Sequence, residues 1–300
     1  MRAVVFAYSN VGDRCLRVLH AAGVQLPLVV THHDNPAETI WFERVADTAA
    51  ELGLPVVRID DPADPQLERM VRGADPDLIF SFYYRAMIPM ALLALAKAGA
   101  YNMHGSLLPQ YRGRAPVNWA VLHGATQTGA TLHEMAAKPD AGAIIDQSAV
   151  PILPDDTARQ VFDKVTVAAE QVLWRTLPAL LAGRAPRRVN DIVSGSYFGA
   201  RKPADGRIDW SLPAQQVYNL VRAVAPPYPG AFTELGGARL IVAKARLRRG
   251  ASERSPRLGL QVEGERIIGV CGDGGVLDIH ELCRGQSPLD AATLLQLLSR

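Results

Sequence analysis

Cysteine is scarce in this sequence. The three cysteines among its 300 residues, Cys15, Cys271 and Cys283, are odd in number and widely spaced, and no CxxC or CxxH pair occurs. This pattern argues against both a disulfide framework and a zinc site, and it is typical of proteins kept in a reducing compartment. We therefore expect a cytoplasmic protein that holds no metal.

An excess of charge of one sign is also missing. The 32 Lys and Arg residues nearly balance the 30 Asp and Glu residues, for a net charge of +2, so the composition does not by itself indicate nucleic-acid binding. No apolar run approaches the roughly 20 residues that span a bilayer, and the first residues lack the pattern of a signal peptide. We expect no nucleic-acid partner and no membrane association.

Two nucleotide-binding fingerprints are absent as well. The turn after the first apolar segment, Tyr8–Gly12, has one glycine where the dinucleotide fingerprint G-x-G-x-x-G needs three. Thr31–His33 stands where that fingerprint calls for an acidic residue after the second strand. The phosphate-binding pattern G-x-x-x-x-G-K-[ST] does not occur. NAD is therefore not an expected cofactor.

Short apolar segments that alternate with amphipathic ones dominate the first part of the chain. This alternation predicts a doubly wound, Rossmann-like α/β domain whose ligands lie outside the carboxyl ends of parallel strands. The expected strands are Ala3–Ala7, Leu26–Thr31, Pro55–Ile59, Asp77–Phe82, one beginning at Ala100, Thr128–Met135 and Ala143–Ser148. The expected helices are Arg14–Gly23, Ala37–Leu52, Gln66–Arg72, Pro89–Ala98, Pro116–Leu122, and one capped by Asp155 and Asp156 that runs to about Leu181.

The composition changes after this long helix. Pro, Gly and charged residues become frequent, which is typical of a linker, and a helix over about Pro213–Val224 follows. Beyond it lie short strands around glycine turns such as Gly236-Gly237, which predict hairpins and a small antiparallel, OB-like β-barrel. We expect a catalytic domain over residues 1–189, a linker over 190–206 and an OB-like domain over 207–300.

The stretch Ala100–Arg114 carries the most chemistry. Asn102 and His104 are two residues apart on an expected strand, so both side chains leave the same face. Asn donates N–H bonds to a developing oxyanion and His exchanges protons near pH 7, while Asp140, in another loop, would orient an imidazole and favour its charged form. Isolated Asn-x-His pairs and turn-capping Asp residues are also common as structural features, so these residues alone leave both readings open.

The fuller motif resembles that of a known family. Asn102-Met-His-Gly-Ser-Leu-Leu-Pro-Gln-Tyr-Arg-Gly113, followed by Asp140-Ala-Gly142, is similar to the signature of the folate-dependent formyltransferases. The likeness continues through Asp205–Trp210, Asn219–Val224 and Pro229–Ala231, so it covers nearly the whole chain. This family includes the enzymes that formylate methionyl-tRNA, glycinamide ribonucleotide and amino-sugar nucleotides.

Within the family, three segments resemble one branch most. Phe6–Tyr8, Thr31–Pro36 and Phe80–Arg85 are similar to the formyltransferase half of the bifunctional enzymes that act on UDP-4-amino-4-deoxy-L-arabinose. In those enzymes an NAD-dependent decarboxylating dehydrogenase follows, whereas this sequence stops at Arg300. We therefore expect a stand-alone formyltransferase or part of a longer protein, without dehydrogenase activity.

The resemblance implies a mechanism and a set of site residues. The co-substrate would be 10-formyltetrahydrofolate, and an amine would attack its formyl carbon. Asn102 and protonated His104 would stabilise the oxyanion, His104 would protonate the departing folate nitrogen, and Asp140 would support His104. The resemblance further implies folate contacts at Ala86, Met87, Ile88, Arg114, Ala136, Ala137, Lys138, Pro139 and Asp140.

Other functions stay open at this point. A different amino-sugar nucleotide is the nearest alternative, and it would use the same chemistry. Methionyl-tRNA would need a basic surface, for which the last domain offers Arg239, Lys244, Arg246, Arg248, Arg249, Arg254 and Arg257, although such a charge run is more often a solvated face. A non-catalytic binding module would require Asn102, His104 and Asp140 to be incidental.

Overall fold

The computed structural model describes residues 1–248 and 257–299. The chain divides into two compact units. The first contains Met1–Pro116, Gln127–Val150 and Phe162–Gly199, and the second contains Val117–Thr126, Pro151–Val161 and the residues from Ala200 onward. The domain boundaries expected at residues 189 and 206 stay predictions.

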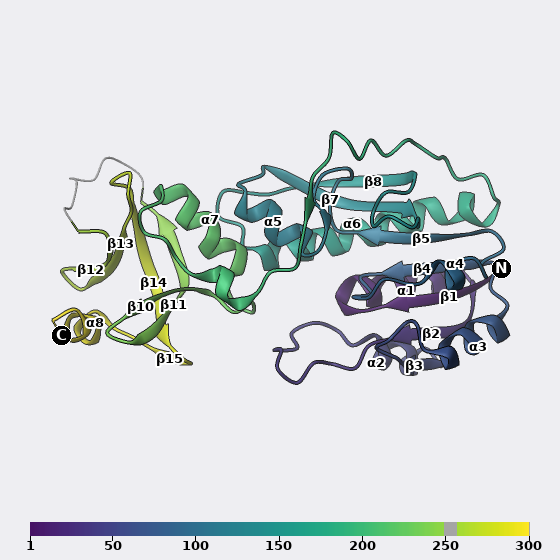
Figure 1. The fold of residues 1–300 in the computed structure, drawn as a ribbon, viewed down its shortest axis with the longest axis horizontal. Coiled ribbons are helices and arrows are strands. Elements are labelled where there is room, and N and C mark those ends of the chain that lie inside the picture. The colour runs from purple at the N-terminus through teal and green to yellow at the C-terminus, as the bar shows by residue number, and fades with distance from the viewer. Residues whose placement is uncertain (249–256, 300) are drawn as a thin grey trace. The chain divides into compact units, whose positions relative to one another are not determined.

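A seven-stranded mixed sheet forms the centre of the first unit (Figure 1). Its order is β3-β2-β1-β4-β5-β7-β8; the strands β1 to β5 pair in parallel, and β7 pairs antiparallel with β5. The bounds are β1 (Arg2–Ala7), β2 (Gln25–Thr31), β3 (Val56–Arg58), β4 (Leu78–Phe82), β5 (Gly99–His104), β7 (Gln127–Glu134) and β8 (Ile144–Pro151). The prediction of a doubly wound α/β domain is confirmed.

Helices cover both faces of this sheet because successive strand residues point to opposite sides. Val4 and Phe6 of β1 share a buried cluster with Leu67 and Val71 of α3 (Pro65–Ala74). On the other face, α1 (Ser9–Ala21) brings Gly12 so near to β1 that a Cβ there would lie 3.1 Å from that of Ala7. The remaining helices associated with this unit are α2 (Val45–Glu51), α4 (Met90–Leu93) and the later part of α6 (Ala158–Leu181).

The helix expected over Ala37–Leu52 is wrong in its first half, since α2 begins only at Val45. Residues 37–44 have other partners that hold them out of a helix. The Glu43 amide donates to Asn10 Oδ1 at 2.8 Å, and the ring of Phe42 packs edge-on against Tyr8 with centroids 5.0 Å apart.

Two further helix predictions need correction. The helix expected over Pro89–Ala98 is the four-residue α4, because the chain already joins the sheet at Ala98, whose amide donates to Asp77 O at 2.7 Å. The long helix starts at Ala158 rather than at an Asp155–Asp156 cap. Asp156 instead accepts a hydrogen bond from the Leu153 amide at 2.7 Å.

The second unit is built on an antiparallel sheet in the order β10-β11-β14-β13-β12, with β15 paired to β14. The bounds are β10 (Ala231–Leu235), β11 (Ala238–Leu247), β12 (Gly259–Glu263), β13 (Arg266–Val270), β14 (Val276–Arg284) and β15 (Ser287–Pro288). The helices of this unit are α5 (Pro116–Leu122), α7 (Ala214–Val224), α8 (Ala291–Leu298) and the short 3-10 helix η1 (Pro203–Gly206). The expected antiparallel C-terminal β domain is confirmed, in the form of a half-barrel. Its predicted hairpin turn is present at Gly236 and Gly237, whose φ angles of 56° and 73° suit glycine.

One small pairing in the first unit had no sequence signal. The two-residue strand β6 (Arg112–Gly113), inside the motif-bearing loop, pairs in parallel with β9 (Tyr197–Phe198). Within residues 1–248 and 257–299, no helix combines the length and apolar character needed to cross a membrane.

Candidate active site

The register of β5 against β7 places three polar side chains on one face of the sheet. Asn102 and His104 follow each other at alternate positions of β5, and Asn102 lies directly opposite His133 of β7. The chain leaves β5 at His104 and enters the loop that carries Arg112–Arg114. The loop between β7 and β8 carries Asp140 back toward the same face.

The Asp140 carboxylate faces both histidine rings. Its Oδ1 lies 3.6 Å from Nδ1 of His104 and 3.5 Å from Nε2 of His133. Asn102 Nδ2 in turn lies 3.0 Å from the same Nε2 of His133. Asn102, His104 and Asp140 are therefore brought together around His133.

The other nitrogen of each ring is fixed by a backbone carbonyl. His104 Nε2 lies 2.8 Å from Tyr111 O, and His133 Nδ1 lies 2.7 Å from Glu134 O. Because a carbonyl oxygen only accepts hydrogen bonds, these two nitrogens carry the protons. In this arrangement a neutral ring presents its unprotonated nitrogen to Asp140, and a protonated ring presents an N–H to it.

Asp140 is held in its charged form by its neighbours. Its side chain is 12% exposed, and burial alone would raise the pKa of the carboxyl. The nearby rings of His104 and His133, with the Gly113 amide that donates to Oδ2 at 2.8 Å, outweigh burial and hold the pKa of Asp140 well below its usual range. The backbone of Asp140 is left-handed, with φ 50°. The arrangement thus offers amide donors, imidazoles and a permanent negative charge in a largely buried space.

The segments expected to contact folate adjoin this site. Ala86 and Ile88 pack on the same hydrophobic cluster as Met135, which leads into Ala136–Asp140, whereas the side chain of Met87 is exposed. Arg114 Nη2 donates to Arg85 O at 2.8 Å and so links the motif-bearing loop to the turn after β4. Their role in folate binding stays a prediction.

Two known protein families match most of the chain. The family described as "Formyl transferase" matches residues 1–177, and "Formyl transferase, C-terminal domain" matches residues 201–298. The chain belongs to the formyl transferase family. The first match includes all strands of the seven-stranded sheet, and the second includes all strands of the antiparallel sheet.

Solved structures share the fold of this formyltransferase at low sequence identity. An N-formyltransferase from Helicobacter canadensis, in complex with folinic acid and dTDP-3-aminofucose, is 18% identical with a TM-score of 0.71, over 93% of this chain and 98% of that chain. A 4-N formyltransferase from Francisella tularensis is 20% identical with a TM-score of 0.65, over 81% and 96%. HypX from Aquifex aeolicus, in complex with tetrahydrofolic acid, is 18% identical with a TM-score of 0.66, over 98% and 47%.

Sequence reasoning missed several residues around the candidate site. His133 was not singled out, because its position opposite Asn102 depends on the pairing of β5 with β7. Tyr111 and Gly113 lie within the motif Asn102–Gly113, but their contacts use backbone atoms, which the residue type does not reveal. Asn190 lies 50 residues from Asp140 in the sequence, and no motif connects the two. His32 and His33, which follow β2, both face Asp60, at 3.4 and 2.9 Å.

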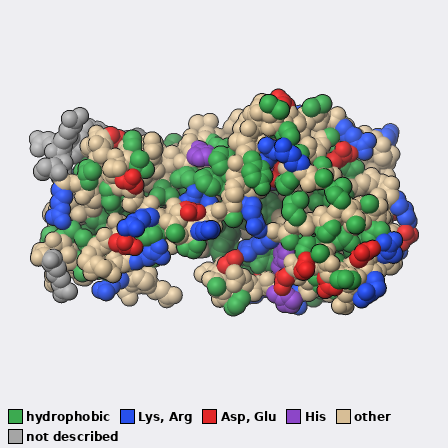
Figure 2. Space-filling model, in the orientation of Figure 1, with side chains coloured by type: hydrophobic (Ala, Val, Ile, Leu, Met, Phe, Trp, Pro, Cys, Tyr) green, Lys and Arg blue, Asp and Glu red, His purple; other side chains and the backbone are tan. Residues whose placement is uncertain are grey.

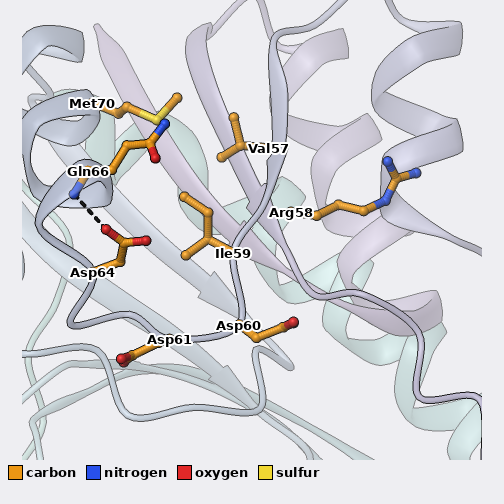
Figure 3. A pocket seen from close by; sticks show the side chains of 8 residues that line it. All are labelled: Val57, Arg58, Ile59, Asp60, Asp61, Asp64, Gln66 and Met70. Atoms are coloured by element: carbon orange, nitrogen blue, oxygen red, sulfur yellow. Dashed lines mark hydrogen bonds between the residues drawn. The ribbon is translucent and has the colours of Figure 1, made fainter.

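A cavity of about 490 Å³ lies elsewhere in the first unit, between the end of β3 and α3. Figure 3 shows Asp60 and Asp61 at the bottom of the view, Asp64 above them on the left and Met70 at the top. The carboxylates of Asp61 and Asp64 accept hydrogen bonds from the backbone amides of Ala63 and Gln66, which is ordinary turn and helix capping. None of the residues that line this cavity belongs to the site around Asp140.

Proposed function

We propose that this formyltransferase transfers the formyl group of 10-formyltetrahydrofolate to the 4-amine of UDP-4-amino-4-deoxy-L-arabinose. The observation that carries the proposal is the position of Asp140 Oδ1, 3.6 Å from His104 Nδ1 on the face that also bears Asn102. His104 is thus a proton-transfer group with a carboxylate beside it and the Asn102 amide nearby. The chain that carries them belongs to the formyl transferase family.

The proposed reaction is an acyl transfer. The nitrogen lone pair of the sugar 4-amine attacks the formyl carbon, and the carbonyl electrons move to oxygen to form a tetrahedral oxyanion. Asn102 and protonated His104 stabilise this charge, and removal of one such donor typically lowers turnover by about 10²–10³-fold. The oxyanion then re-forms the carbonyl as the bond from the formyl carbon to N10 breaks and His104 gives a proton to N10. The attacking nitrogen releases its extra proton to solvent, and His104 is protonated again from solvent.

The hydrogen bonds of His104 set a condition on this step. Its Nε2–H donates to Tyr111 O and its Nδ1 faces Asp140, so donation to the substrate requires that the Tyr111 bond be exchanged for one to the substrate. Asp140 supports the imidazolium while this happens, since a carboxylate with a lowered pKa stays charged throughout. Asp140 is therefore a positioning residue that acts through His104.

We assign folate binding to the segments that surround Asp140. Backbone groups of Ala86, Met87 and Ile88, the side chain of Arg114, and the run Ala136–Asp140 would contact the pteridine and its bridge. The folinic acid and tetrahydrofolic acid of the H. canadensis and A. aeolicus structures support the choice of a folate donor. The reaction as written requires neither a metal nor NAD.

Sequence segments in the first unit support the choice of acceptor. Phe6–Tyr8, Thr31–Pro36 and Phe80–Arg85, which resemble the aminoarabinose branch, belong to the ends of β1, β2 and β4 and the turns after them. An amino-sugar nucleotide is also the ligand of the H. canadensis structure. Such an enzyme would act in the cytoplasm and supply aminoarabinose for lipid A modification and resistance to cationic peptides such as polymyxin.

Methionyl-tRNA is the alternative acceptor that a specific observation favours, namely the basic residues of the second unit. Two of these are held in ion pairs, and a third packs on an aromatic ring. Arg246 pairs with Asp155 at 2.6 Å, Arg248 pairs with Asp278 at 2.5 Å, and Arg239 stacks over a phenylalanine ring. Arg249 and Arg254 lie outside the described residues. Figure 2 shows acidic and basic side chains interspersed on the face in view, rather than a continuous basic surface.

Purified protein with 10-formyltetrahydrofolate and one acceptor at a time tests the proposal. The acceptors are UDP-4-amino-4-deoxy-L-arabinose, a dTDP-linked 3-amino sugar and methionyl-tRNA, with the formylated product measured by mass spectrometry. We expect the highest kcat/KM with the UDP-linked sugar. Formylation of methionyl-tRNA alone would overturn the proposal, and preference for the dTDP sugar would replace its acceptor.

A further inference from the structure

Residues 188–198, here called the strap, contact both loops of the candidate site, the one that follows His104 and the one that carries Asp140. The strap lies between the two regions that match the family, residues 1–177 and 201–298, and sequence analysis assigned most of it to a linker. It nevertheless belongs to the first compact unit. The exposed fraction of Val193 on the strap is 91%, whereas Asn190 is 9% exposed, so the strap presents one buried polar side chain to the protein.

The strap binds the loop that follows His104 through its backbone. The amides of Arg112 and Arg114 donate to Ser196 O and Phe198 O at 3.0 and 2.9 Å. Ser196 Oγ accepts from the amide of Tyr111 at 2.8 Å. Tyr111 is the residue whose carbonyl accepts from His104 Nε2. The strap thereby fixes the partner of one ring nitrogen of His104.

Glycine permits this close approach at two places. A Cβ on Gly113 would lie 2.2 Å from Phe198 O, and a Cβ on Gly195 would lie 2.3 Å from Pro109 O. Beneath the strap, the buried guanidinium of Arg112 lies 5.7 Å from the centre of the Tyr197 ring. The loop and the strap are therefore packed as one layer.

The other end of the strap binds the loop that carries Asp140. Arg188 exchanges two backbone hydrogen bonds of 2.8 Å with Ile144 at the start of β8. Asn190 Nδ2 then donates to both Asp140 O, at 3.0 Å, and Gly142 O, at 3.1 Å. These bonds hold the turn from Asp140 to Gly142. Asp140 has a left-handed backbone, which is unfavourable for residues other than glycine, Asn and Asp.

We propose that Asn190 is a positioning residue of the formyl transfer, which holds the Asp140 turn so that the carboxylate stays against His104 and His133. The strap joins both partners of the His104 ring, Tyr111 O on one side and Asp140 on the other. The Gly113 amide, which donates to Asp140 Oδ2, links the two loops to each other. The inference rests on the proposed function for its effect on turnover.

Removal of the Asn190 amide leaves the carbonyls of Asp140 and Gly142 without this donor and frees the turn. A carboxylate displaced by about 1 Å would reduce turnover on the order of 10²-fold. Contacts to the amino-sugar nucleotide would be retained, so its KM would change little, whereas KM for the folate donor would rise because Ala136–Asp140 belongs to the proposed folate site. The groups that face the carboxylate are His104 on β5, His133 on β7 and the Gly113 amide on β6. If the carboxylate moved away from them, the lowered pKa of Asp140 would rise toward the ordinary value of a carboxyl group.

Two measurements test the inference, each made on the variants Asn190→Ala, Asn190→Ser and Val193→Ala. The first is kcat and KM with the formyl donor and the amino-sugar nucleotide. The second is the titration of the Asp140 side-chain carboxyl, followed by ¹³C NMR without any substrate. We expect Asn190→Ala to lose about 10²-fold in kcat and to show an Asp140 pKa closer to its ordinary value. Asn190→Ser, which keeps one donor, should recover part of both, and the exposed Val193→Ala should match the wild type.

An Asp140 titration in Asn190→Ala that matches the wild type would overturn the inference, whatever happens to turnover. Equal losses of kcat in Asn190→Ala and Val193→Ala would overturn it too, because they would indicate a general effect on the strap. If Asn190→Ala does not fold, the same two measurements on Asn190→Ser decide the question. If the wild type formylates no amino-sugar nucleotide, the proposed function fails, while the NMR titration still decides on the role of Asn190.

Discussion

Replacement of Asp140 by Asn removes one charge from the site with little change in shape. Asn tolerates the left-handed backbone that position 140 adopts, with φ 50°, and its oxygen can still accept from the Gly113 amide. Its NH₂ group then faces His104 Nδ1 and His133 Nε2, where it donates to unprotonated nitrogens. The substitution therefore removes the negative charge that faces both rings.

The size of the effect follows from the distance. Opposite unit charges 3.6 Å apart attract each other by about 4–5 kcal/mol at an effective dielectric constant of about 20. Each 1.4 kcal/mol or so corresponds to a factor of ten in rate, which sets a ceiling near ~10³-fold. Because water and the retained hydrogen bond compensate in part, we expect kcat to fall by ~10²–10³-fold, with KM for the amino-sugar nucleotide nearly unchanged.

The assay is product formation at saturating 10-formyltetrahydrofolate and amino-sugar nucleotide, with thermal unfolding as a check on the fold. Asp75→Asn is a matched control, because Asp75 is also left-handed, with φ 46°, and pairs with Lys97 at 2.6 Å outside the site. It should keep wild-type kcat. A folded Asp140→Asn enzyme with kcat within threefold or so of the wild type would refute the electrostatic reasoning.

Three further predictions concern acid stability, the strap and the second histidine. Because the folded state lowers the pKa of Asp140, its ionised form stabilises the fold above the ordinary carboxyl pKa of about 4. Urea unfolding should therefore show a difference between wild type and Asp140→Asn at pH 6 or so that shrinks as pH falls through the lowered pKa; a pH-independent difference would count against this. Gly113→Ala should lower the free energy of unfolding by about 1–3 kcal/mol, because φ is 95° and Phe198 O leaves no room for a Cβ, whereas Gly199→Ala, with open space around it, should not. His133→Phe removes the partner of Asn102 Nδ2 and should lower kcat by about 10–10²-fold without weakening acceptor binding; an unchanged kcat would show that Asn102 needs no such support.

The strands of the first unit could be predicted because they are continuous apolar runs, as buried parallel strands must be. Val4, Phe6, Leu28 and Val30 illustrate this, since all are buried in one cluster. Helix ends were less predictable where long-range contacts decide them. The segment 37–44 has helical composition, yet Asn10 and the ring of Tyr8 hold it in another conformation.

The candidate site could be predicted only where its residues share a motif. Asn102 and His104 are neighbours on one strand, and the resemblance to formyltransferases added Asp140. His133 enters through strand pairing, and Asn190 enters through a segment that is 50 residues from Asp140 in the sequence. Composition made that segment resemble a linker, because its Pro, Gly and charged residues say nothing of the backbone bonds it forms with two loops.

The most direct test of the central claim is a single-turnover measurement with a ¹³C-formyl-labelled folate donor and the UDP-linked amino sugar. In the wild type we expect the label to appear in the formamide of the nucleotide sugar. In His104→Ala the rate of this transfer should fall by at least ~10², while the dissociation constants of both substrates stay close to those of the wild type. Transfer at a wild-type rate in His104→Ala would contradict the assignment of this site.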